Sequence, residues 1–345
     1  MFLAATVLGQ VERWLGPIDA ARRWLYRAGV PWLGAWIRDR EIRVGLHGMV
    51  VVGGSLVGAV FAPLWLLALG PLLLGVPHLV ADLRYLVAQP GLHRRRGAVV
   101  VGGLLVLTGL TADLRWGLAG AVLAALGARA SWWRRALAVA PLIALLAAAI
   151  WASSAAGVFL AHAHNLFAVV LWLAISAAVH RGRALGHPAR WAPAGASVLG
   201  GAVLLSGAVD PWLLTDLRFP GTPSIAGYAR SLAPGLDPVW ATRWVVTFAY
   251  AQAVHYGLWL RVVPEDARRR PSPRSFKASL AALRRDLGDS TMTMAVIAVV
   301  VIAVWGLIDV SEARSGYFRL ALFHGPLELA VLGLVGAEGV KALRK

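Results

Sequence analysis

Nine histidines occur in a chain that contains no cysteine, so a transition metal could be held only by imidazole or carboxylate groups. Ionisable residues inside apolar helices are costly and tend to face a bundle interior or a cavity. Six of the histidines lie within or at the edge of long apolar stretches and are candidate metal ligands: His47, His78, His162, His164, His255 and His324. The remaining three, His93, His180 and His187, lie in or beside arginine-rich segments and are expected to be solvated.

Two apolar stretches repeat one pattern, a histidine followed four residues later by a carboxylate. His78 precedes Asp82 in GVPHLVAD, and His324 precedes Glu328 in FHGPLE. Residues at i and i+4 share one face of a helix. Each pair could therefore bind one metal jointly, or the carboxylate could orient a ligating imidazole. A plain hydrogen bond between two buried groups is the alternative, but two pairs favour a metal site with Asp82 and Glu328 as candidate catalytic residues.

The other candidate histidines have histidine, polar or aromatic residues near them in the sequence. His162 and His164 are two residues apart, so they point to nearly opposite sides of a helix and only one is expected to bind the metal. His255 stands beside Tyr250, Gln252 and Tyr256. These three residues and Trp172 are candidate substrate-binding residues, with helix packing or anchoring at the membrane interface as the alternative role for the aromatic rings.

The depth of the histidines leaves the number of sites open. At about 1.5 Å of rise per residue, His164 and His324 lie roughly 8–10 Å from the outer end of their helices, and His78 and His255 near 20 Å. One site in the outer-middle of the bilayer is compatible with this spread. Two layers, with His47 in the inner one, are also compatible.

The elements that must position these residues are transmembrane helices. Apolar residues make up 59% of 345 residues, charged residues only 15%, and the mean hydropathy is +0.67. A soluble protein could not bury so much apolar surface. We predict an all-α polytopic bundle whose spans, each compared with the roughly 20 residues a spanning helix needs, are 44–62, 65–87, 97–112, 116–130, 136–152, 157–180, 192–209, 241–262, 291–309 and 317–340.

The distribution of arginine predicts the orientation. The formal charge of +17 arises largely from segments on one side of the predicted spans, including Arg94–Arg96, Arg134, Arg135, Arg284 and Arg285, whereas the loops on the other side are poor in arginine. By the positive-inside rule, both termini are cytoplasmic and the protein lies in a prokaryotic inner or plasma membrane. The charge therefore gives no reason to expect a nucleic-acid partner.

Three segments lie outside the predicted spans. Residues 1–43 mix tryptophan, leucine and arginine and are expected to be amphipathic helices at the membrane interface, apart from the transmembrane domain 44–345. Within 263–290, the stretch SFKASLAALRRDLG predicts a surface helix. The proline-rich loop 210–240 is expected to form an ordered lid on the outer side.

Residues 75–86, GVPHLVADLRYL, resemble the Brp/Blh family of integral membrane carotene-cleaving oxygenases. Gly75, Pro77, His78 and Asp82 match the family's motif, and Leu79 stands where the family usually has glycine. The resemblance covers about a dozen residues. It implies a non-haem Fe(II) held by histidines, dioxygen as co-substrate, and oxidative cleavage of a polyene such as β-carotene to retinal. His47, His164, His255 and His324 are candidates for the further ligands by their placement alone.

Two other function classes are compatible with the residues. One is another metal-dependent lipid enzyme, a desaturase or hydroxylase, although the HxxxH and HxxHH clusters of such enzymes are absent from the sequence. The other is a transporter or channel with a relay of intramembrane histidines and carboxylates. Zinc and copper also accept imidazole ligands. In the enzyme interpretations, the partners are membrane lipids, dioxygen and an apolar or lipid substrate dissolved in the bilayer.

Overall fold

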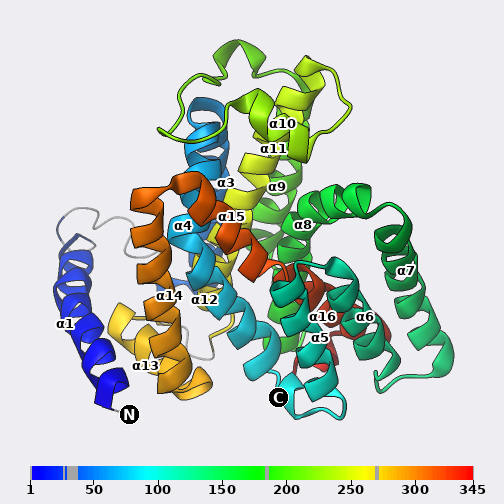
Figure 1. Cartoon of the computed structure of the whole chain (residues 1–345). Coiled ribbons are helices and arrows are strands. Elements are labelled where there is room, and N and C mark those ends of the chain that lie inside the picture. The colour runs from blue at the N-terminus through cyan, green and yellow to red at the C-terminus, as the bar shows by residue number, and fades with distance from the viewer. Residues whose placement is uncertain (1, 26–27, 29–37, 183–185, 269–271, 345) are drawn as a thin grey trace.

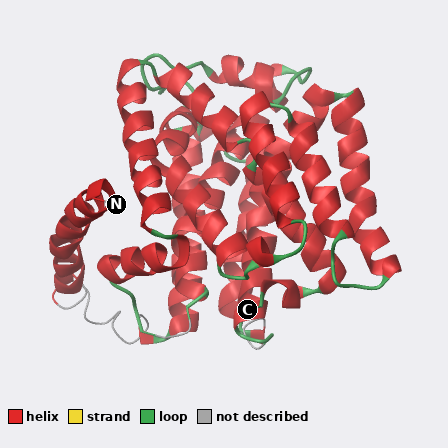
Figure 2. Ribbon diagram, turned by 60° about the horizontal axis from the view of Figure 1, so that its bottom comes forward, coloured by secondary structure: helices red, strands yellow, loops and turns green. Residues whose placement is uncertain are grey.

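The computed structural model describes residues 2–25, 28, 38–182, 186–268 and 272–344, and these residues form helices joined by short connections (Figures 1 and 2). No strand occurs in the described ranges, so the predicted all-α class is confirmed. The helices, in chain order, are α1 Phe2–Trp24, α3 Arg40–Phe61, α4 Pro63–Asp82, α5 Ala98–Thr111, α6 Leu114–Leu126, α7 Trp132–Trp151, α8 Ser153–Val179, α9 Pro188–Ser206, α10 Ile225–Leu232, α11 Pro238–Gly257, α12 Val263–Asp266, α13 Phe276–Leu287, α14 Asp289–Ile308, α15 Val310–Ala321 and α16 His324–Glu338.

Helices occupy each of the ten apolar segments predicted to span a membrane, as a chain in lipid would require, because its backbone groups must be satisfied internally. In the described part of the chain, six helices are long and apolar enough to cross a membrane: Arg40–Phe61, Pro63–Ala88, Trp132–Trp151, Ser153–Val179, Asp289–Ile308 and Val310–Glu338. The short helices α5 and α6 are each about 20 Å long, less than the hydrocarbon thickness of about 30 Å.

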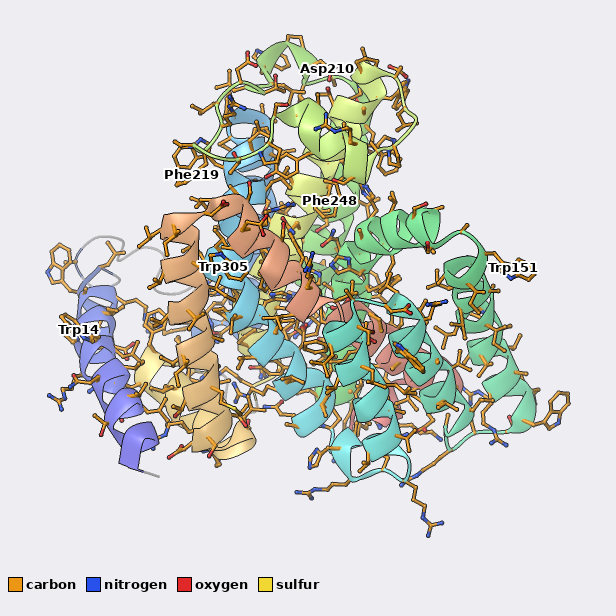
Figure 3. All side chains as sticks on the ribbon, in the orientation of Figure 1. Trp14, Trp151, Asp210, Phe219, Phe248 and Trp305 are labelled. Carbon is orange, nitrogen blue, oxygen red and sulfur yellow. The ribbon has the colours of Figure 1, made fainter. Side chains whose placement is uncertain are left out.

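The N-terminal segment contains a helix that packs against the predicted surface helix. α1 contacts α13 and α14, where Leu8, Leu280 and Met292 form a small buried cluster. Trp14 remains 74% exposed and points outward, as Trp151 does at the far side of the bundle (Figure 3). Residues 29–37 of this segment lie outside the described residues.

The first long apolar helix begins at Arg40, four residues before the predicted start at residue 44. The cause is an N-cap: the Asp39 side chain accepts a hydrogen bond from the Ile42 backbone N–H at 3.1 Å. At the other end of the chain, α15 begins at Val310 rather than 317, since Asp309 caps it through the Glu312 N–H at 2.9 Å. A two-residue turn at 322–323 lies between α15 and α16, so the predicted span 317–340 has an irregularity just before His324 within the continuous apolar stretch Val310–Glu338.

The segment 210–240 is ordered and caps one end of the bundle. It contains the short helix α10, which packs against α11, and Arg243 binds Asp210 at 2.6 Å. In Figure 1, α10 lies at the top of the molecule, and the marks for both chain ends lie at the bottom. The segment with α10 and the two chain ends therefore lie at opposite ends of the molecule.

Candidate metal centre

Four histidines from four helices converge inside the bundle: His78 of α4, His164 of α8, His255 of α11 and His324 at the start of α16. The centroid of the His324 ring lies 5.0 Å from those of His78 and His164 and 5.8 Å from that of His255. The His255 centroid lies 5.3 Å from that of His78 and 5.1 Å from that of His164. We call these four residues the histidine cluster.

The cluster has the donor geometry of a metal site. His78, His255 and His324 each offer a ring nitrogen, and these three atoms lie within 4.8 Å of one another. Five buried ring nitrogens, both of His78, both of His255 and Nε2 of His324, have no hydrogen-bond partner among the described residues. A buried polar group left unpaired costs about 1–3 kcal/mol. A cation bound between the rings would satisfy several of these atoms at once, so the donor set fits a metal ion.

Two of the rings are oriented by nearby backbone carbonyl groups. His164 Nδ1 lies 3.0 Å from the Leu160 carbonyl oxygen, and His324 Nδ1 lies 2.5 Å from the Ala321 carbonyl oxygen. A hydrogen bond to a carbonyl places the proton on Nδ1 of a neutral imidazole, and Nε2 is then the lone-pair donor. His164 and His324 therefore present Nε2 as the atom available to a metal.

Irregular helix geometry occurs next to the cluster. α4 passes into a π-helix at Leu83–Ala88 after Asp82, and α11 passes into another at Leu258–Val262 shortly after His255. Such π-segments occur frequently at functional sites because they rotate the residues around them. The turn before His324 similarly interrupts the helix at the start of α16. Three of the four helices that carry a cluster histidine, α4, α11 and α16, therefore depart from regular α geometry near the cluster.

Glycine allows α4 to approach α15 at this level. A Cβ atom built on Gly75 would lie 2.4 Å from the ring of the buried Tyr317. No side chain fits at that position without movement of the ring or the helix. The glycine of the GVPH motif thus has a packing role that the sequence does not reveal, one turn before the first ligand histidine.

The two candidate carboxylates are completely buried one turn beyond His78 and His324. Glu328 Oε1 accepts a hydrogen bond from Trp259 Nε1 at 3.1 Å, whereas its Oε2 has no partner. Neither oxygen of Asp82 has a hydrogen-bond partner in the described ranges. No hydrogen bond joins either carboxylate to an imidazole of the cluster there, so their assignment as catalytic residues stays a prediction.

Two histidines predicted as ligands lie outside the cluster. His162 Nε2 lies 2.9 Å from the Leu232 carbonyl oxygen, and its ring packs on Trp244 and Phe248. His47 Nε2 accepts a hydrogen bond from Arg261 at 2.7 Å. Of the pair on α8, the structure therefore brings His164 into the cluster and places His162 against α10.

The candidate substrate residues differ in their distance from the cluster. The Tyr256 ring centroid lies 4.6 Å from that of His78, and Gln252 is buried on the same helix with its Oε1 unpaired within the described residues. Tyr250 instead donates to the Ser197 carbonyl oxygen at 3.1 Å. Trp172 donates to Asp266 Oδ2 at 3.0 Å. Of these four residues, only Tyr256 has a ring contact with the cluster among the described contacts.

Trp172 belongs to a buried polar network that the sequence reasoning missed. Asp266 also accepts hydrogen bonds from Arg190 at 2.8 Å and pairs with His180 at 3.1 Å. Burial by itself would raise the pKa of Asp266, but the hydrogen bonds from His180 and Arg190 outweigh it and hold this pKa at about 2. The expectation that His180 is solvated was wrong, because Asp266, 86 residues away in sequence, packs against it.

Two further residues at the centre were also missed. Trp259 binds Glu328, and its position four residues after His255 could have identified it. Tyr317 packs against Gly75, and only the tertiary structure shows this contact. In comparisons with known proteins, no family model, curated protein or solved structure matches this chain.

Proposed function

We propose that this protein is an integral membrane non-haem iron oxygenase, and that it cleaves a carotenoid such as β-carotene oxidatively to retinal. The single observation that carries the metal assignment is the convergence of four imidazoles inside a bundle of apolar helices, three of which, His78, His255 and His324, have unpaired buried nitrogens. The choice of iron and of a polyene rests on the resemblance of Gly75, Pro77, His78 and Asp82 to the motif of the carotene-cleaving oxygenases.

In this proposal, His78, His164, His255 and His324 hold Fe(II), which would supply the redox chemistry that activates dioxygen. The backbone hydrogen bonds of His164 and His324 orient their rings. Complete burial of His78 and His255 would keep bulk water away from a reactive centre. Tyr256 packs on His78 and would bound the space in which the substrate lies.

The location fits the substrate, because a polyene is dissolved in the bilayer and reaches a buried site between helices. We propose that all ten apolar helical segments belong to the membrane domain, with the arginine-rich end and both termini on the cytoplasmic side of an inner or plasma membrane. The short helices α5 and α6 would then form a hairpin packed against α16.

Metal analysis of the purified protein tests the centre. We expect about one iron per chain after purification from iron-supplemented cells, and loss of that iron in His78→Ala and His164→Ala. His162→Ala is a matched control, since it removes an imidazole from the same helix but outside the cluster. Absence of a bound transition metal in the wild type would overturn the proposal, and stoichiometric zinc or copper would overturn the assignment of iron.

Expression in a β-carotene-producing host tests the substrate. The wild type and His162→Ala should bleach the cells and yield retinal, whereas His78→Ala should leave the pigment unchanged. Unchanged pigment with an iron-loaded wild type would exclude β-carotene while leaving the metal centre intact.

A further inference from the structure

A second site lies at the end of the bundle opposite α10. A cavity of about 1310 Å³ is lined by the start of α3, the π-helix Leu83–Ala88, the end of α8, the segment 272–275 and α13. Figure 1 shows α13 and the C-terminal mark at this end of the molecule. Ligand pockets in proteins commonly measure about 300–1,000 Å³, so the cavity has room for a small molecule or a lipid headgroup.

The lining is strongly cationic. Asp286 is its one acidic residue in the described part of the chain, against seven arginines: Arg40, Arg84, Arg181, Arg268, Arg274, Arg285 and Arg344. A concentration of one sign of charge in a concave site attracts ligands of the opposite sign.

Only part of this charge is neutralised by the protein. Arg84 binds Asp286 at 2.9 Å, and Arg268 binds Glu265 at 3.1 Å. Arg181, Arg274 and Arg344 form no ion pair with a carboxylate of the described residues. Burial, and next the neighbouring Arg84 guanidinium, lower the pKa of Arg274, as expected for cations that lie close together. A bound anion would relieve this repulsion.

We propose that this cavity binds a phosphate-bearing anion through Arg274, Arg344 and their arginine neighbours. Guanidinium groups match the geometry of phosphate oxygens in two-point contacts. Basic pockets between membrane helices are also places where anionic headgroups bind. The ligand is therefore either the headgroup of an anionic phospholipid or a soluble phosphate compound. The proposal is independent of the metal centre and of its substrate.

Two probes distinguish these sources on the full-length protein. In detergent, calorimetry with inorganic pyrophosphate measures the soluble source. In nanodiscs, native mass spectrometry after exchange into phosphatidylcholine measures whether phosphatidylglycerol is retained. Saturable binding of pyrophosphate supports the site with a soluble ligand, and selective retention of phosphatidylglycerol supports it with a lipid ligand.

Variants connect either result to the cavity. We expect Arg274→Gln to weaken the observed binding about tenfold, the loss expected for one charge-assisted hydrogen-bonding group. Arg344→Gln, at an exposed position near the chain end, gives a second measurement if Arg274→Gln does not fold. Arg96→Gln is the control, since Arg96 is exposed in an arginine-rich loop and does not line the cavity. Binding of neither probe, or an equal loss in Arg96→Gln, would overturn the proposal.

Discussion

Buried polar side chains in this protein fall into two groups according to whether they are paired. Asp266, Arg190, His180 and Trp172 satisfy one another through hydrogen bonds and ion pairs. The histidine cluster instead leaves five ring nitrogens without partners in the described ranges. A satisfied network rigidifies a fold, whereas several unpaired donors that face one another form a place where a ligand could bind. The concentration of unpaired nitrogens in one place distinguishes the histidine cluster from the Asp266 network.

Asp266 should make the stability of the protein depend on pH. Its pKa is about 2 in the folded protein and would return towards 3.8 on unfolding. Because the folded value is the lower one, the stabilisation is complete above pH 4 and is lost as pH falls through 2. We expect Asp266→Asn to lower the free energy of unfolding by about 2–4 kcal/mol at pH 6. At pH 3 this difference from the wild type should be smaller by about 1 kcal/mol.

The measurement is unfolding of both proteins in detergent across this pH range. Asp216→Asn is the control, since Asp216 is exposed in the segment 210–240 and should show no such difference. If Asp266→Asn lowers the free energy of unfolding by the same amount at pH 3 and pH 6, the negative charge of Asp266 does not stabilise the fold.

At the scale of helices, irregularity positions the cluster. α4, α11 and α16 each have a π-segment or a break within about one or two turns of their ligand histidine. The positions of these helices could be predicted from apolar runs in the sequence, because a helix in lipid needs an apolar composition over its whole length. These runs did not predict the π-segments, since such a segment depends on which neighbour the helix must pack against.

The close approach of α4 and α15 at Gly75 can be tested by adding one methyl group. Gly75→Ala would place a Cβ 2.4 Å from the Tyr317 ring. We therefore expect the free energy of unfolding to fall by about 1–3 kcal/mol, which is typical of overpacking. Displacement of α4 should also lower the metal content, because His78 follows one turn later. Thermal unfolding and metal analysis measure the two effects.

Gly53→Ala provides the matched control for this variant. Gly53 lies in α3, and a Cβ there would meet no atom within 4 Å. The Tyr317→Leu change should partly rescue Gly75→Ala by opening space. Equal effects of Gly75→Ala and Gly53→Ala would show that the contact with Tyr317 does not limit the packing.

At the scale of the whole molecule, the two ends differ in charge and in architecture. One end carries the ordered segment 210–240 with α10, and the other carries α13 and the arginine-lined cavity (Figure 1). In the proposed orientation, the positive-inside rule places the arginine-rich end in the cytoplasm.

Single cysteines test this orientation, and the chain offers a background without cysteine. Ser231 lies near the end of α10, Ser131 directly precedes α7, and both side chains are exposed, so we choose the variants Ser231→Cys and Ser131→Cys. We expect a membrane-impermeant maleimide to label only Ser231→Cys in intact cells and to label both after lysis. Labelling of Ser131→Cys alone in intact cells would reverse the orientation.

Composition and spacing alone determined that this chain is an all-helical protein with membrane-length apolar helices, and they reduced nine histidines to six candidates. These are local properties, because hydropathy and the i, i+4 relation act within one helix. Only the tertiary structure decided that the rings of His78, His164, His255 and His324 meet, while His47 and His162 form hydrogen bonds elsewhere. Ring positions depend on helix rotation, π-segments and glycine contacts between distant helices, and no single segment of sequence contains that information.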